Sequence, residues 1–259
     1  MTAHIETSHR TVKIDLARPM PISIRLRDGA QNPLAWYAPY PTMTPVAMEG
    51  FIGSVAQGGS VNTSDITMNP HGNGTHTECI GHLTEQAHEL DEYMRNHIHL
   101  ATVLTVEATV LTSDDGPNRK MGDRVIMASV LDKLKVHPDV KALVIRTTPN
   151  TDEKLTQVYT GHNPTYLDPA LCRAIRVLGF EHLLLDLPSV DRESDGGLML
   201  AHRAFWYDED GNARMHSTIT EMVYVPNKII DGEYLINIMV APLGNDASPS
   251  KPILYPIIP

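Results

Sequence analysis

One passage in the second half of the chain constrains the fold more than any other. Two apolar, β-branched runs, Ala142–Thr147 and His182–Leu187, have the composition of buried strands. Between them, Asp168 and Pro169 stand at the cap and first-turn positions of a helix that Gly179 ends. A strand, a helix and a second strand in this order form a crossover unit, so we expect the two strands to lie parallel in one sheet.

Other segments extend this pattern to the rest of the chain. Apolar runs predict two more strands, over Val103–Leu111 and Tyr234–Val240. Apolar residues at helical spacing predict a helix over Thr84–Arg95, and a shorter helix is predicted over Ala128–Lys135. Residues 1–80 are richer in Pro, Gly and Asn, and we expect strands joined by irregular loops there.

The length and composition favour one domain. The chain has 259 residues, of which 42% are hydrophobic, and this is enough to build a full core. We find no Gly/Ser-rich linker, internal repeat or low-complexity tract that would separate two domains. We therefore expect a single α/β domain over residues 1–259, with a mixed sheet and flanking helices.

The charge and the apolar pattern exclude several classes of partner. The formal net charge is −10, and no cluster of Lys and Arg offers a surface for nucleic acid or for an anionic membrane. No run approaches the ~20 apolar residues of a spanning helix, and the N-terminus carries no signal-peptide stretch. The two cysteines, Cys79 and Cys172, lack the paired spacing of a disulfide framework. We expect a cytoplasmic protein whose partner is a small molecule or another copy of the chain.

The segment Asn69–His82 carries the clearest chemical signal. It combines three of the 13 histidines with a glutamate, and these are the usual side chains around Zn²⁺, Mn²⁺ or Fe²⁺. Two glycines between His71 and His76 allow a tight turn, so both imidazoles can face the same point. His76 and Glu78 lie two positions apart and share one face of an extended segment. A solvated His-rich turn is the alternative, but four candidate ligands in one short loop favour a metal or catalytic site.

Other chemistry stays open on the residues alone. Cys79, inside this segment, could act as a thiol nucleophile, although a small buried hydrophobe is the simpler interpretation. Ser189 and His202 could form a serine hydrolase, but no Gly-x-Ser-x-Gly turn supports it. His162 precedes the long helix at a point where a substrate loop could lie.

The sequence also resembles a known family. The stretch His71–His82 is similar to the signature of the cyclase family, His-x-Gly-Thr-His-x-Asp-x-Pro-x-His. This family contains bacterial kynurenine formamidases and isatin hydrolase. The likeness continues, in the family's order, along most of the chain. The further matches are Asp15-Leu16, Leu143–Thr147, Leu184–Asp191, Ala201-His202-Arg203 and Thr220-Glu221.

Three positions depart from the signature. Asn73 lengthens the spacing between His71 and His76 by one residue. Glu78 stands where the family has Asp, and Ile80 where it has Pro. The changes either compensate each other around one ion or mark a subgroup with a different substrate.

The resemblance implies a fold, a metal site and an assembly. The family fold is a swivelling β/β/α domain, in agreement with the mixed sheet expected above. By the resemblance, the metal ligands would be His71, His76, Glu78 and His82, and the ion would be Zn²⁺ or Mn²⁺, with one or two ions in each chain. Family members form dimers or tetramers with sites near the subunit boundary, so we expect a homodimer or homotetramer.

The resemblance also implies hydrolysis of an amide attached to an aromatic ring. A divalent metal ion lowers the pKa of a water from about 15.7 to about 7, which prepares it to attack an amide carbonyl. His82 would pass a proton to the leaving amine, and His202 and Glu221 would complete the site as ligands of a second ion or as partners of His82. The alternatives are a lyase or cyclase that uses the same ion to stabilise an enolate, and a metal-binding protein without turnover.

Aromatic side chains are the candidates for substrate contacts. By analogy with the family, Trp36 and Tyr37 would wall the substrate pocket, in their own or a neighbouring subunit, with packing beneath a Pro-rich loop as an equal alternative. Trp206, four residues after His202, is another candidate wall residue, although core packing is the commoner role for such a side chain.

Overall fold

A mixed β-sheet runs through the part of the chain that the computed structural model describes, residues 1–116, 119–132 and 134–259. Its central strands are parallel, and they are β9 (Ile98–Glu107), β12 (Val140–Thr148), β14 (His182–Leu185) and β15 (Thr218–Glu221). β16 (Gly232–Val240) extends the sheet antiparallel to β9. The mixed α/β fold predicted from the sequence is confirmed.

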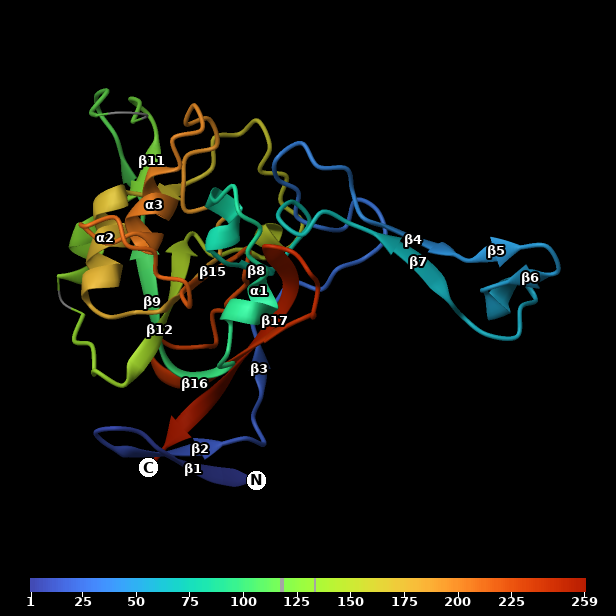
Figure 1. The fold of residues 1–259 in the computed structure, drawn as a ribbon, viewed down its shortest axis with the longest axis horizontal. Helices are drawn as coiled ribbons and strands as arrows, with labels where there is room; N and C mark the ends of the chain where they lie inside the picture. The colour runs from blue at the N-terminus through green and yellow to red at the C-terminus, as the bar shows by residue number, and fades with distance from the viewer. Residues whose placement is uncertain (117–118, 133) are drawn as a thin grey trace.

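The crossover unit forms as the sequence predicts. α2 (Pro169–Val177) connects β12 to β14, and these two strands are parallel neighbours. The Asp168 side chain caps α2 by accepting a hydrogen bond from Ala170 N at 2.7 Å. α3 (Leu200–Trp206), which no sequence pattern indicates, lies beside α2 (Figure 1).

Alternate residues of the central strands are buried on opposite faces of the sheet, which therefore has two cores. Leu143 and Ile145 of β12 belong to the core that includes the buried residues of α2 and α3. Ala142 and Val144 of the same strand belong to the core on the other face. Each Leu or Ile that is fully buried in this way stabilises the fold by about 1.5–3 kcal/mol.

The two edges of the sheet meet at β8 (His76–Glu78). This strand pairs antiparallel with β15 on one side and with β17 (Ala247–Ile258) on the other. β17 pairs in turn with β16, so the strands form a closed ring. β17 also pairs with β2 (Thr11–Asp15) and β3 (Met20–Pro21), and Figure 1 shows the N-terminal hairpin beside the end of β17.

A long hairpin, residues 42–67, projects from the body of the molecule, and we call it the arm (Figure 1). β4 (Thr42–Pro45) and β7 (Ser64–Thr67) pair at its base, and β5 (Ala47–Met48) and β6 (Phe51–Ile52) pair at its tip. All four residues of β7 are exposed.

The remaining elements are short. They are β1 (Thr2–Glu6), β10 (Thr109–Val110), β11 (Arg124–Ile126), β13 (Tyr166–Leu167), α1 (Leu90–Tyr93) and the 3₁₀ turns Val55–Gln57, Ile80–Leu83, Ala128–Leu131 and Asp152–Leu155. None of the described helices combines the length and the apolar character that a membrane crossing requires.

The helix predicted over Thr84–Arg95 is wrong in extent, because only the single turn α1 forms there. Leu90 and Met94 are buried as the helical pattern requires, but Ala87 is exposed. The cause is a tertiary contact: Leu90 N donates a hydrogen bond to Asn245 O at 2.9 Å, which holds this segment against the loop before β17. The helix predicted over Ala128–Lys135 is a 3₁₀ turn over Ala128–Leu131, and residue 133 lies outside the described residues.

Candidate functional site

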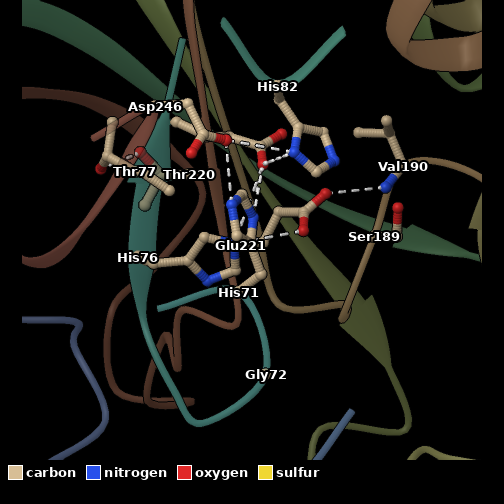
Figure 2. Close-up of polar contacts among 12 residues, drawn as sticks. His71, Gly72, His76, Thr77, His82, Ser189, Val190, Thr220, Glu221 and Asp246 are labelled. Atoms are coloured by element: carbon tan, nitrogen blue, oxygen red, sulfur yellow. Dashed lines mark hydrogen bonds and ion pairs between the residues drawn. The ribbon is translucent and has the colours of Figure 1, made fainter. Parts of the chain in front are cut away.

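β8 supplies the centre of the site. His76 and Glu78 share one face of this strand, as predicted, and both are fully buried. Thr77 points the opposite way, where its hydroxyl contacts the hydroxyl of Thr220 at 2.7 Å. Glu221 lies directly across from His76 in β15, and its Oε2 is 3.5 Å from His76 Nε2 (Figure 2).

The turn before β8 accommodates the inserted Asn73. Asn69 N donates to Asn73 Oδ1 at 2.6 Å, and Asn73 Nδ2 donates to Pro39 O at 2.9 Å. Gly72 fits into this turn because it has no side chain: a Cβ there would lie 2.5 Å from the Cβ of Ala38. The side chain of the inserted Asn73 therefore stabilises the turn through these two hydrogen bonds.

His71 stays within the site despite the longer spacing. Its Nδ1 lies 3.1 Å from Glu78 Oε2, and the centroid of its ring is 5.2 Å from that of His76. Its other nitrogen, Nε2, faces Asp246 Oδ2 at 3.0 Å. His82, from the turn after β8, stacks on His71 with centroids 4.4 Å apart, and its Nδ1 lies 3.3 Å from the same Asp246 oxygen.

His202 enters the site from α3. Asp191 accepts hydrogen bonds from the backbone N–H groups of Ala201 and His202, at 2.7 and 3.1 Å. The same carboxylate contacts His202 Nδ1 at 2.6 Å. This orients His202 so that its Nε2 lies 3.1 Å from Glu78 Oε1.

Asp191 and Asp246 are the site residues that the sequence-based assignment leaves out. Asp191 lies in a segment that resembles the family, but the sequence gives its carboxylate no role. Asp246 has no motif around it, and it reaches His82 because the pairing of β17 with β8 places the preceding loop there. Its place in the site follows from the tertiary structure, and no local sequence pattern indicates it.

Charges within the cluster change the protonation of its members. Burial disfavours the charged form of His71, but the contacts with Asp246 and Glu78 outweigh burial and raise the pKa of His71 to about 10. Burial also opposes the charge on His202, whose contacts with Asp191 and Glu78 raise its pKa to about 10. Although burial favours the neutral form of Glu78, the imidazoles around it hold its pKa well below its usual range. A divalent cation would compete with these protons for the same donors.

The donor set fits a divalent metal ion. His76 Nε2 and Glu78 Oε2 are buried and make no hydrogen bond, although His71 Nδ1 lies 3.1 Å from Glu78 Oε2 and Glu221 Oε2 lies 3.5 Å from His76 Nε2. Buried polar atoms without hydrogen bonds cost free energy, and a cation bound between these two would satisfy both. Three sets of donor atoms lie within 4.8 Å of one another, and they are His71, His76 and Glu78; Glu78, His82 and His202; and His71, His82 and Asp246. Imidazole and carboxylate together suit Zn²⁺ or Mn²⁺.

A cavity of about 380 Å³ lies against this cluster. Its polar lining includes His71, His82, His202 and Glu221, and Met199 contributes an apolar side chain. A small organic molecule bound there would touch the imidazoles directly.

The aromatic residues predicted to contact substrate are placed differently from one another. Trp36 lines the cavity, whereas Tyr37 is 79% exposed and does not. The prediction that Trp206 walls the pocket is wrong, because this side chain has no exposed surface. It stacks on His202 with centroids 5.5 Å apart, and its Nε1 donates to Ser217 O at 2.9 Å. Its role is core packing that supports the His202 ring.

The geometry does not support the other chemistry considered above. The Cys79 thiol is buried and donates to a backbone carbonyl at 3.3 Å, and burial raises its pKa to about 11. Ser189 lines the cavity, but both ring nitrogens of His202 face carboxylates, and Ser189 Oγ accepts a hydrogen bond from Asp191 N at 3.1 Å. His162 lines a different cavity, of about 300 Å³.

The solved structures that the chain resembles share its fold at low sequence identity. One is described as a potential metal-dependent hydrolase with cyclase activity (14% identity, TM-score 0.63, 93% of this chain and 99% of that chain covered). Isatin hydrolase A from Labrenzia aggregata has 10% identity and a TM-score of 0.63, with 92% and 93% of the two chains covered. Isatin hydrolase A from Ralstonia solanacearum has 10% identity and a TM-score of 0.59, with 92% and 91% covered.

Sequence comparison places the chain in a family. No curated protein matches the chain. The model of the Cyclase family matches residues 14–192, a span that holds most of the site, from His71 to Asp191, and more than half of the chain. The chain therefore belongs to the cyclase family.

Proposed function

We propose that the chain is a metal-dependent hydrolase that acts on an aryl formamide or a cyclic amide. One observation carries this proposal: two buried donor atoms without hydrogen-bond partners, His76 Nε2 and Glu78 Oε2, lie among further imidazoles beside a cavity. The isatin hydrolases among the structural relatives support a hydrolase acting on an amide.

The metal ion would be Zn²⁺ or Mn²⁺, held by His71, His76 and Glu78. His202 and Glu221 face the same region from α3 and β15, and they offer donors for the same ion or for a second one. When bound, the ion supplies a Lewis acid and an acidified water. The protein contributes a buried setting in which the ligands are already oriented.

His82 is the residue to which we assign proton transfer. It lines the cavity, and its side chain is 29% exposed, so it can meet a bound substrate. Its Nδ1 faces Asp246, and Figure 2 shows its second ring nitrogen on the side away from that carboxylate. This nitrogen would pass a proton to the leaving aryl amine.

The cavity favours an aromatic amide that has no free carboxylate. Trp36 and Met199 provide apolar lining. Arg192 also lines the cavity, but its guanidinium donates to both carboxylate oxygens of Asp123, at 2.9 and 3.3 Å, and to Ser194 O at 2.7 Å. Because Arg192 is held in this way, we place isatin and formanilide before N-formylkynurenine as test substrates.

A lyase or cyclase that stabilises an enolate at the same site is the second candidate function. The description of one structural relative as having cyclase activity favours it. Such an enzyme would bind the same ion but would not hydrolyse amides. A family member that binds metal without turnover would behave the same way toward amides.

We also propose that the chain forms a homodimer or homotetramer through the arm. The arm exposes Met48, Val55, Val61 and Ile66 to solvent. A two-stranded hairpin is only marginally stable in water by itself. A second copy that covers these apolar side chains would stabilise the arm.

The first experiment measures metal content and turnover on the same preparation. The protein is purified without a histidine tag, dialysed against a weak chelator and examined by elemental analysis, followed by single-turnover reactions with isatin and formanilide. We expect one or two equivalents of zinc or manganese and hydrolysis of at least one amide. Retained metal with no amide hydrolysis would favour the lyase or the inactive metal binder. A chain that holds no metal after reloading would overturn the proposal.

A further inference from the structure

Asp246 contacts two histidines of the site with a single oxygen atom. Its Oδ2 lies 3.0 Å from His71 Nε2 and 3.3 Å from His82 Nδ1 (Figure 2). The residue directly precedes β17, and it lies outside residues 14–192, which match the family model. The pairing Ala247↔Glu78 between β17 and β8 fixes its position beside the site.

The position of the proton on His71 decides whether this side chain can bind a metal ion. A neutral imidazole has one N–H and one nitrogen with a free lone pair, and a metal ligand must present the lone pair. His71 Nδ1 faces Glu78 Oε2 in the buried cluster, whereas Nε2 faces Asp246. Both nitrogens thus face carboxylates, which accept hydrogen bonds and cannot donate them. A metal ion bound by Glu78 would displace the proton on Nδ1 and take its lone pair, while Asp246 keeps the remaining proton on Nε2.

The two fully buried histidines of the site are held in the same way. His202 presents Nε2 to the cluster, while Asp191 contacts its Nδ1 at 2.6 Å. His76 presents Nε2, and its Nδ1 lies 2.9 Å from Gly74 O. Each imidazole therefore has one nitrogen toward the cluster and the other against an acceptor, which is how metal-ligating histidines are commonly oriented. Asp246 is the acceptor for His71.

The same oxygen also orients His82. Because Asp246 faces His82 Nδ1, it favours the N–H on that nitrogen and leaves the lone pair on Nε2. His82 lines the cavity, so this second nitrogen is the one available to a substrate. One carboxylate thus fixes the tautomers of a candidate ligand and of the candidate proton-transfer residue.

On the basis of the metal site proposed above, we propose that Asp246 is a positioning residue that holds His71 Nε2–H and His82 Nδ1–H, and so prepares His71 Nδ1 to bind a divalent metal ion.

A direct role of Asp246 as a metal ligand with both histidines is the competing arrangement. The ligand atoms of His71, His82 and Asp246 lie within 4.8 Å of one another, so this arrangement is a real alternative. The 3.0 and 3.3 Å separations from Asp246 Oδ2 are hydrogen-bond distances, and they support the positioning role.

The test measures Mn²⁺ binding to the full chain, from the electron paramagnetic resonance signal of the free ion. The variants are Asp246→Ala, Asp246→Asn and, as a matched control, Glu89→Gln, which removes an exposed carboxylate near the same loop. We expect Asp246→Ala to weaken Mn²⁺ binding by about 10–100-fold with unchanged stoichiometry, the usual effect of removing such an acceptor. Asp246→Asn keeps one acceptor oxygen and should lose less affinity. The control should bind as the wild type does.

A spectroscopic measurement separates positioning from a general loss of structure. Nitrogen NMR of the zinc-loaded wild type should show the N–H of His71 on Nε2 and that of His82 on Nδ1. Asp246→Ala should lose this selection while its thermal unfolding midpoint without metal stays near that of the wild type. Unchanged Mn²⁺ affinity in Asp246→Ala would overturn the positioning role. Loss of one whole equivalent of Mn²⁺ would show that Asp246 is itself a ligand. A wild type that binds no Mn²⁺ would overturn the metal site itself.

Discussion

At the scale of single residues, His76 and His82 differ in burial, and this difference predicts different consequences of their removal. His76 is fully buried with a donor nitrogen that has no hydrogen-bond partner, whereas His82 is partly exposed and lines the cavity. The first arrangement suits a metal ligand and the second a proton donor.

We therefore predict that His76→Ala abolishes hydrolysis and His82→Ala leaves a measurable remnant. Loss of a ligand removes the ion and its activated water, whereas loss of a positioned acid or base reduces the rate by about 10²–10⁴-fold. Steady-state rates on the best amide substrate, together with metal content of each variant, check this. The assignment fails if both variants turn over as fast as the wild type.

The sequence identifies the site residues that lie close together in the chain, and it misses those that only the fold brings in. The His71–His82 segment could be read directly, because spacing and residue type are local. Asp246 could not, because the two histidines that it contacts lie 175 and 164 residues away in sequence and the strand pairing that brings them together is tertiary. For Trp206 the sequence predicts a substrate contact that does not form, because the side chain is buried in the core. Closeness to a site histidine in sequence does not distinguish an aromatic residue of the pocket from one of the core.

At the scale of secondary-structure elements, the turn before β8 depends on a glycine that has no room for a side chain. A Cβ on Gly72 would lie 2.5 Å from Ala38 Cβ and 3.0 Å from Ala35 O. This turn also carries His71, so its shape determines where the imidazole points.

We predict that Gly72→Ala destabilises the protein by about 1–3 kcal/mol, the usual cost of overpacking, and weakens metal binding by moving His71. Urea unfolding and Mn²⁺ titration measure the two effects. Gly50→Ala is the control, because Gly50 has open space around it and lies in the arm, so that the strain of its positive φ should reduce stability without changing metal affinity. Equal metal affinity in Gly72→Ala and the wild type would contradict the role of the turn.

Elements with strong local signals were predicted well, and those determined by tertiary contacts were not. α2 has a cap, an apolar face and an ending glycine, and it forms where the sequence predicts it. The segment 84–95 has helical spacing, but its backbone is held by the loop before β17, and a helix forms for one turn only. The closure of the sheet through β8 could not be predicted from the sequence either, because a strand of three residues is too short to show an alternating pattern.

At the scale of the whole molecule, the arm is the part that extends farthest from the body (Figure 1). It has two-stranded pairing and exposed apolar residues, and both features support the subunit contact proposed above. We therefore expect changes in the arm to affect assembly and to leave the fold of the body unchanged.

We predict that replacing residues 46–63 by an Asn-Gly turn lowers the oligomeric state without unfolding the body. Light scattering coupled to size-exclusion chromatography should show a dimer or tetramer for the wild type and a smaller species for the shortened chain. Met48→Lys with Val55→Lys tests the same contact while leaving the hairpin in place. The same number of subunits in all three proteins would rule out the arm as the interface.

β17 pairs with β16, β2, β3 and β8, and it is the last of these strands to be synthesised. The ring of strands therefore cannot close until synthesis has passed β17. At about 5–20 residues per second, roughly 10–30 s of synthesis separate Glu78 from Ala247. Throughout that interval His71 and His76 are made but the strand beside them is not, and the edge of β8 has no partner from β17. The ring that places Asp246 beside His71 and His82 can therefore close only after residues 247–258 have left the ribosome, and any metal ion that the site binds would meet its final geometry only then.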